Sequence, residues 1–270
     1  MLDSVAAMAF LRFRTACFLA LATGWSGAAT AIAIAAPNAP TSVVRWVDGS
    51  YQYRRLTDGG ERGRETFRMS LHADGTRVMR ATTDIFSRGV QVSVIQRVAP
   101  NFRPLDAHVT MYLAGGFKGA GTFVVVGDRL TAATRTAGGI ATRQYSVPDS
   151  VSIGSHPLVL DGWHTWHVRP ELGKVQAGTV FLIDGDPDLT KPMLGTARAT
   201  KFEYLGENDV VVPAGRFRAR HYRIDGRAEV WIATEDRILI RSVWPQYGSE
   251  YVLEQLDRSD RPKPENKQGD

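Results

Sequence analysis

Cysteine is almost absent from this sequence, since Cys17 is the only one among 270 residues. It lies within an N-terminal apolar segment, so the rest of the chain has no disulfide and no cysteine ligand for a metal. A chain of this size buries roughly 70% of its unfolded surface and needs no such cross-link. These observations exclude a disulfide-rich scaffold and a zinc site built from cysteines.

Helical periodicity is also missing outside that N-terminal segment. The sequence contains no Gly-rich phosphate loop, nucleophile elbow, kinase motif or zinc-protease motif. The net charge of +5 is spread along the chain. Such a mild excess suits anionic lipid or an acidic ligand, and it is too diffuse to indicate nucleic acid. We therefore expect no nucleic-acid partner and no cofactor or metal.

The first part of the chain has the features of an export signal. Two arginines are followed by a run of small and apolar residues that ends just before Pro37. The last residues of this run have the small-x-small pattern that a signal peptidase recognises. We predict a signal peptide over residues 1–36, cleaved near Ala35 or Ala36, and a periplasmic protein. A retained membrane anchor is the alternative, because the run is long enough to span a bilayer.

What is present after the signal is a series of strand patterns. Apolar and polar residues alternate in short runs, and turn residues recur roughly every ten positions. This spacing is typical of all-β domains. We predict one β domain over residues 37–257, with room for a short connecting helix near residues 160–168. The charged, proline-containing segment 258–270 is predicted to be a disordered tail.

The strongest single turn signal is Asp225-Gly226, which separates two alternating runs. A two-residue loop there would place His221 on the apolar face together with Val230 and Ile232. The same register would place Arg220 near Trp231. We therefore expect His221 to be a core histidine or, less simply, a ligand contact.

Three segments of this region together resemble a known family. They are Val212-Pro213-Ala214-Gly215-Arg216-Phe217, His221-Tyr222 and Glu229-Val230-Trp231-Ile232. With the strand-rich first half, they resemble exported bacterial proteins of the DUF3108 type. The resemblance implies a strongly curved antiparallel sheet, half-barrel or lipocalin-like, similar to the half-barrels of periplasmic lipoprotein carriers. It implies no catalytic residues, because that family has no settled function.

Half of the six histidines and two of the six tryptophans lie between positions 156 and 167. Three interpretations of this segment stay open: a loop that plugs one end of the sheet, a ligand contact without chemistry, and a catalytic or metal site. Carboxylate and imidazole groups supply general bases and zinc ligands. The candidates for catalysis are Asp161, His164 and His167. The candidates for ligand binding are His156, Trp163, Trp166, His221 and Trp231.

The most favoured function is binding or carrying an apolar or amphipathic molecule, such as a lipid, in the cell envelope. A pocket of this kind binds mainly through buried apolar area. Its predicted lining is Val90, Val92, Val94, Val230, Ile232 and Ile240, and no site exists if these side chains fill the space themselves. One alternative is a hydrolase or lyase that uses the segment 156–167. Another is a structural protein that contacts an envelope protein or the membrane surface.

Overall fold

The structure is a computed structural model that describes residues 42–260, and everything below refers to these residues. They form 15 β-strands and two short 3-10 helices, η1 and η2. The first eight strands are β1 (Val43–Arg55), β2 (Glu61–His72), β3 (Arg77–Ile85), β4 (Val90–Val98), β5 (Pro104–Leu113), β6 (Gly116–Val126), β7 (Arg129–Thr136) and β8 (Gly139–Ser146).

The remaining elements follow a short connection after β8. They are β9 (Val151–Gly154), η1 (Leu158–Thr165), β10 (Val175–Leu182), β11 (Thr196–Val212), β12 (Gly215–Ile224), β13 (Ala228–Ala233), β14 (Leu239–Trp244), η2 (Pro245–Tyr247) and β15 (Ser249–Asp260). The prediction of an all-β fold with a curved antiparallel sheet is confirmed. The helical segment η1 overlaps the predicted helix near residues 160–168.

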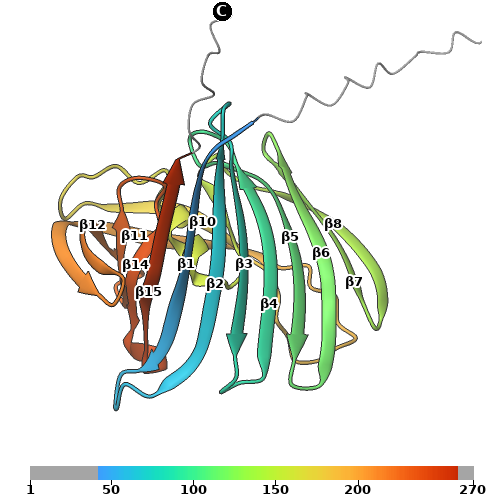
Figure 1. Cartoon of the computed structure of the whole chain (residues 1–270). Coiled ribbons are helices and arrows are strands. Elements are labelled where there is room, and N and C mark those ends of the chain that lie inside the picture. The colour runs from blue at the N-terminus through green and yellow to red at the C-terminus, as the bar shows by residue number, and fades with distance from the viewer. Residues whose placement is uncertain (1–41, 261–270) are drawn as a thin grey trace, which may run out of the picture. The chain divides into compact units, whose positions relative to one another are not determined.

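All 15 strands belong to one open sheet, in which strands that follow one another in the chain also pair, apart from β8 and β9, which lie at opposite edges. The first and last strands, β1 and β15, pair with each other in the interior of the sheet. Figure 1 shows β15 in red beside β1 in blue. Every pair is antiparallel apart from β9 and β10. The two edge strands are β8 and β9, so the sheet does not close.

Alternation within the strands decides which face is buried. In β3 and β4 the residues Met79, Val92 and Val94 are buried, whereas Arg80 and Ser93 are exposed. Successive side chains of a strand point to opposite faces, so each strand has an apolar and a polar row. The apolar rows face the core.

The core lies between the two halves of the sheet, β1–β8 and β9–β15. Phe181 of β10 packs against Phe123 of β6 and Tyr145 of β8, with ring centroids 6.0 and 4.9 Å apart. Helix η1 lies in the space between the halves. Its Trp163 is 1% exposed and donates a hydrogen bond to the β13–β14 turn. The concave side of the sheet is therefore occupied by the protein's own side chains.

This packing corrects the predicted ligand pocket. Val92, Val94, Val230, Ile232 and Ile240 are buried members of the core, and Val90 packs against them. The apolar lining that the sequence indicated is thus filled by neighbouring side chains instead of surrounding an apolar ligand. Any large site has to lie on another face.

The predicted register of the β12–β13 hairpin was wrong by one residue. Ile224 pairs with Ala228, so the loop has three residues, with Asp225 and Gly226 both at positive φ. The extra residue places His221 opposite Trp231 instead of with the buried Val230. A shift of one residue moves a side chain to the other face of the sheet.

The limits of the domain differ slightly from the prediction. Strand β15 continues to Asp260, three residues beyond the predicted boundary at 257. The predicted signal peptide lies outside the described residues, as does the tail after Asp260. Between residues 42 and 260 there is no helix long and apolar enough to cross a membrane.

Candidate functional site

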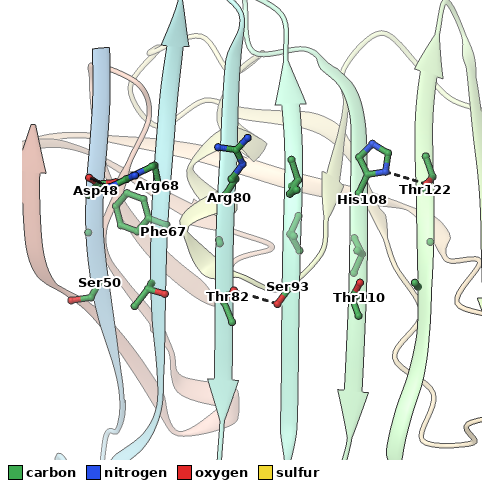
Figure 2. Close-up of a pocket in the computed structure, with 18 of the residues that line it drawn as sticks. Asp48, Ser50, Phe67, Arg68, Arg80, Thr82, Ser93, His108, Thr110 and Thr122 are labelled. Carbon is green, nitrogen blue, oxygen red and sulfur yellow. Dashed lines mark hydrogen bonds and ion pairs between the residues drawn. The ribbon is translucent and has the colours of Figure 1, made fainter. Parts of the chain in front are cut away.

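A groove of about 940 Å³ lies on the face of β1–β7 that points away from the core. Figure 2 shows side chains of neighbouring strands standing side by side on this face. Two rows of outward-facing residues cross the strands and form its surface. The floor between them contains Phe67 and Val94, whose side chains mainly face the core.

The first row carries most of the charge. It runs from Asp48 through Arg68, Arg80 and Ile95 to His108, each paired across the strands with the next. Arg68 donates two hydrogen bonds to Asp48, at 2.5 and 2.9 Å. No carboxylate among the described residues pairs with Arg80, which leaves its guanidinium available to an anion.

The second row is rich in hydroxyl groups. Ser50, Thr66, Thr82, Ser93 and Thr110 follow one another across β1–β5. Thr82 and Ser93 are hydrogen-bonded at 3.2 Å. Because neighbouring strands lie about 4.8 Å apart, the row offers a hydroxyl group at nearly regular intervals to a ligand that lies across the strands.

The chemical character of the groove changes from one side to the other. One side of the groove lies on the neighbouring strands β15, β1, β2 and β3, which contribute Asp257, Asp48, Arg68 and Arg80 in that order. On β6–β8 the border contains four small or apolar residues, two threonines and one arginine: Ala120, Gly121, Ala133, Ile140, Thr122, Thr134 and Arg135. Ile140 is 81% exposed, and Ile95 in the middle of the groove is 42% exposed. The groove is thus polar at one side and more apolar at the other.

The structure brings two of the predicted catalytic residues together. Asp161 and His164 lie on η1, and the Nε2 atom of His164 is 3.3 Å from a carboxylate oxygen of Asp161. Both line a small pocket of about 150 Å³ between η1, β10, β11 and η2. The other ring nitrogen of His164 is buried and has no hydrogen-bond partner. Among residues 42–260, no hydroxyl or thiol group is hydrogen-bonded to this nitrogen in a position to be activated by it.

The other two histidines of the segment do not complete a metal site. The ring of His156 lies 6.3 Å from that of Tyr53, and the ring of His167 lies 5.5 Å from that of Phe202. Burial lowers the pKa of both histidines, which favours their neutral forms. The described residues contain no group of three or more His, Cys, Asp or Glu side chains that could hold a metal ion.

The two tryptophans of the segment have structural partners. Trp163 donates its indole N–H to the backbone carbonyl of Asp236 at 3.0 Å, and Trp166 donates to the carbonyl of Val151 at 3.1 Å. A buried indole that finds such a partner fills the core without leaving a polar atom unpaired. Neither tryptophan lines the groove or the small pocket.

His221 and Trp231 form a separate cluster on β12 and β13. Their rings stack with centroids 4.2 Å apart, and Glu229 lies 3.0 Å from the Nε2 atom of His221. Burial lowers the pKa of His221, and the nearby carboxylate of Glu229 acts in the opposite direction. Arg241 lies over the Trp231 ring at 5.2 Å. These contacts account for both residues without a ligand.

The sequence reasoning missed Glu65, a buried carboxylate on β2. It accepts hydrogen bonds from the hydroxyls of Tyr53 and Thr83 and from the backbone N–H groups of Leu158 and Val159. Burial raises its pKa to about 7, although these hydrogen bonds favour the charged form. The sequence did contain an indication that Glu65 is buried: it lies two residues before Phe67 in an alternating strand, and therefore on the same buried face.

Fold and groove together define an open, curved antiparallel β-sheet protein with a polar recess on its outer face. No family model and no curated protein matches the sequence. Among solved structures, it is similar to a β-barrel-like DUF1849 protein of Brucella abortus, at a TM-score of 0.49 and 11% identity over 82% of this chain and 100% of that one.

Two further structures show weaker similarity. A DUF1089 family protein of Pseudomonas aeruginosa has a TM-score of 0.42 and 10% identity over 67% of this chain and 88% of that one. A Bacteroides fragilis protein, described as a putative exported protein with a YmcC-like fold, has a TM-score of 0.27 and 14% identity over 81% and 97%. At these TM-scores none of the three similarities supports a function, and membership of DUF3108 stays a prediction.

Proposed function

We propose that this chain is an exported binding protein that holds an amphipathic molecule in the groove on β1–β7. The ligand lies across the strands, with an anionic head beside Arg80 and an apolar chain directed toward Ile140. This proposal rests on the change of polarity from one side of the groove to the other. A wholly apolar ligand is less well suited, because the apolar face of the sheet is already covered by the side chains of the core.

The dimensions of the groove support this role. Small-molecule sites usually enclose about 300–1,000 Å³, with largely apolar walls and a few polar groups that orient the ligand. The groove, at about 940 Å³, is near the upper end of that range. Ile95 and Ile140 offer exposed apolar surface, Arg80 offers an unpaired cation and Thr82 offers a hydrogen-bonding hydroxyl. Such a site favours a long molecule with one charged end.

The proposed location is the periplasm. Its support is the signal-like sequence of residues 1–36, together with the lack of any thiol after Cys17. A groove open to one side suits a carrier that collects a lipid-like molecule at one membrane and releases it at another. Fractionation of cells that express the full chain, with N-terminal sequencing of the mature product, tests the location.

Binding is tested with a dansyl-labelled fatty acid, whose fluorescence rises on transfer to an apolar surface. We expect saturable binding to the protein, and an Ala120→Trp variant that fills the groove should weaken it by at least about tenfold. The matched control is Val126→Trp, because Val126 lies further along the same strand, is exposed, and does not line the groove. Far-UV circular dichroism confirms that both variants fold.

A second variant tests the position of the head. Replacing Arg80 with glutamine should weaken binding about fivefold, the effect of losing one partly solvated ion pair. The corresponding fatty alcohol, which lacks the carboxylate, should show no such loss. Equal binding to wild type, Ala120→Trp and Val126→Trp would overturn the proposal, as would the absence of saturable binding to the wild-type protein.

A further inference from the structure

The two edges of the sheet differ in how well they are protected. Strand β9 has only four residues, three of them buried, and it pairs in parallel with β10. Strand β8 has eight residues, none of them buried. Natural edge strands are usually kept from pairing by shortness, proline, lysine or a β-bulge. Strand β8 has no proline, no lysine and no register shift against β7, so it is a regular edge that is open to pairing.

Alternate residues of β8 direct their backbone polar groups away from β7. The N–H of Val147 donates to the carbonyl of Asp128 at 2.8 Å, which continues the register of the β7–β8 pair. In an antiparallel ladder every second residue bonds to the partner strand, so the odd-numbered residues of β8 bond to β7. No other strand within residues 42–260 pairs with β8. The even-numbered residues therefore present their N–H and C=O groups at the edge: Ile140, Thr142, Gln144 and Ser146.

The charged side chains of this part of the sheet are mostly positive. Asp128 is the single acidic residue within positions 116–146. Arg129 and Arg135 of β7 and Arg143 of β8 are exposed, and none of them pairs with a carboxylate among the described residues. A carboxylate that approaches the edge of β8 would thus find arginines that no other group neutralises.

One acidic segment lies near the β7–β8 turn. Thr136 donates its hydroxyl to the backbone carbonyl of Thr190 at 3.1 Å, which brings residues 184–191 beside this turn. The three aspartates of the segment accept hydrogen bonds from backbone N–H groups inside it, and one of them also pairs with a lysine of the same segment. Arg129 and Arg143 lie farther from the turn along the hairpin, so the positive charge of the edge is concentrated there.

We propose that β8 is the docking edge for an extended acidic segment of a partner protein, which adds to the sheet as a further strand. The even-numbered residues supply the backbone hydrogen bonds of this β-augmentation, and Arg143 binds a carboxylate on the added strand. A second copy of this chain is less well suited, because it would bring another set of unpaired arginines to the same edge. The groove uses Ile140 alone from β8, so docking is separate from the proposed carrier function.

The probe is a fluorescein-labelled peptide of eight residues in which glutamate alternates with valine. Fluorescence polarisation with the wild-type protein should show saturable binding, and the same peptide with lysine in place of glutamate should bind at least about tenfold more weakly. Amide hydrogen exchange followed by NMR then locates the peptide. Exchange of the even-numbered amides of β8 should slow when the peptide is added, and exchange in β9 should stay unchanged.

A proline at the edge tests the backbone contacts without breaking the hairpin. Thr142→Pro removes an N–H that β7 does not use, and proline is tolerated at such edge positions. We expect this variant to bind the glutamate peptide at least about tenfold more weakly. Thr142→Ala keeps the N–H, so it is the matched control and should bind as the wild type does. Far-UV circular dichroism confirms that both variants fold.

A second pair of variants tests the charge. Arg143→Gln should weaken binding of the glutamate peptide about fivefold and reduce its dependence on salt. Arg88→Gln removes an exposed arginine on the β3–β4 turn and should leave the affinity unchanged. Ala120→Trp, which fills the groove, should also leave it unchanged, so failure of the carrier function and failure of this proposal can be told apart.

Three outcomes would overturn the proposal. Equal affinity for the glutamate and lysine peptides would show that the arginines do not select the partner. Equal binding to the wild type and Thr142→Pro, without slower exchange in β8, would place the peptide elsewhere. Analytical ultracentrifugation that shows a dimer of the wild type, dissociated by Thr142→Pro, would assign the edge to a second copy of this chain.

Discussion

Tyr53 on β1 donates its hydroxyl proton to the carboxylate of Glu65 on β2, with the two oxygen atoms 2.5 Å apart. Both side chains are almost fully buried. The same carboxylate accepts the backbone N–H groups of Leu158 and Val159, at 2.7 and 2.9 Å. Glu65 thus joins the sheet to the start of η1, and it satisfies N–H groups that a helix end leaves without intrahelical partners.

Glu65 should make the stability of the protein depend on pH. Its pKa is raised to about 7 in the folded protein from 4.5. The folded state therefore holds a proton that the unfolded state has released, and stability decreases as pH rises between these two values. The stabilising contribution is fully present below pH 4.5 and lost above pH 7. The expected loss is about 3 kcal/mol, measured by urea unfolding at pH 4.5, 6 and 8.

The Glu65→Gln variant provides the comparison, because its amide is neutral throughout this range. The pKa values of His156, His167 and His221 are lowered by burial, so these residues act in the opposite direction near neutral pH. They are present in both proteins, and the difference between the two pH profiles isolates Glu65. Parallel profiles for wild type and variant would contradict the assignment.

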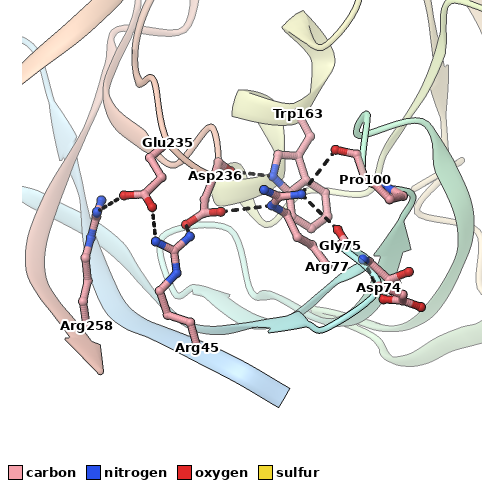
Figure 3. A network of polar contacts seen from close by, with 10 residues as sticks. Arg45, Asp74, Gly75, Arg77, Pro100, Trp163, Glu235, Asp236 and Arg258 are labelled. Carbon is pink, nitrogen blue, oxygen red and sulfur yellow. Dashed lines mark hydrogen bonds and ion pairs between the residues drawn. The ribbon is translucent and has the colours of Figure 1, made fainter. Parts of the chain in front are cut away.

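Among the ion pairs, those of the buried carboxylate of Asp236 should contribute most to the free energy of unfolding. Its side chain is fully buried and accepts hydrogen bonds from Arg45 and Arg77 (Figure 3). Asp236→Ala removes the carboxylate that pairs with Arg77 and one of the two that pair with Arg45, and should lower the free energy of unfolding by about 3–5 kcal/mol. The neighbouring Glu235 is 53% exposed, so Glu235→Gln should lower it by less than about 1 kcal/mol. Urea unfolding of the two variants measures the contrast.

Gly162 should not tolerate a larger residue. A Cβ atom there would lie 1.9 Å from the backbone carbonyl oxygen of Arg237, which is far inside van der Waals contact. Gly162→Ala should therefore force η1 away from the β13–β14 turn and lower the melting temperature clearly. Gly185→Ala is the control, because its Cβ would meet only the flexible side chain of Met111 at 3.7 Å. Similar melting temperatures for the two variants would show that η1 is free to shift.

Lys118 should hold the segment between β10 and β11 against the sheet. Its side chain is fully buried, and its ammonium group donates to the backbone carbonyls of Asp188 and Lys191. Lys118→Met keeps most of the side-chain volume but removes these donors. We expect faster amide hydrogen exchange over residues 184–195, with β1–β4 unchanged. Lys174→Met, at an exposed lysine paired with Glu171, should leave exchange in 184–195 as in wild type.

The sequence contains enough information for the class of fold, since alternation in segments such as Arg77–Ile85 and Val90–Val98 predicts half-buried strands. It does not determine the register of the hairpin at Asp225. The same Asp-Gly pair suits loops of two or three residues, because both types need positive φ. That one residue decided on which face His221 lies.

The location of the site was harder to infer, because it depends on contacts between distant segments. Alternation shows that Arg80 and Val94 face opposite sides, but it does not say which side another part of the chain covers. Here η1 and the second half of the sheet cover the apolar side. Spacing by three residues on a helix did bring Asp161 and His164 together, whereas the positions of His156 and His167 depend on packing against Tyr53 and Phe202.

The pairing of β1 with β15 has a consequence for biogenesis. Two strands from opposite ends of the described chain meet in the middle of the sheet, with Tyr51 opposite Leu253. The hydrogen bonds of this seam form only after the last strand has been synthesised, and such long-range contacts slow folding. Until then β1 has one unsatisfied edge, so a molecular chaperone that shields it would delay the final step without obstructing the β2–β8 hairpins.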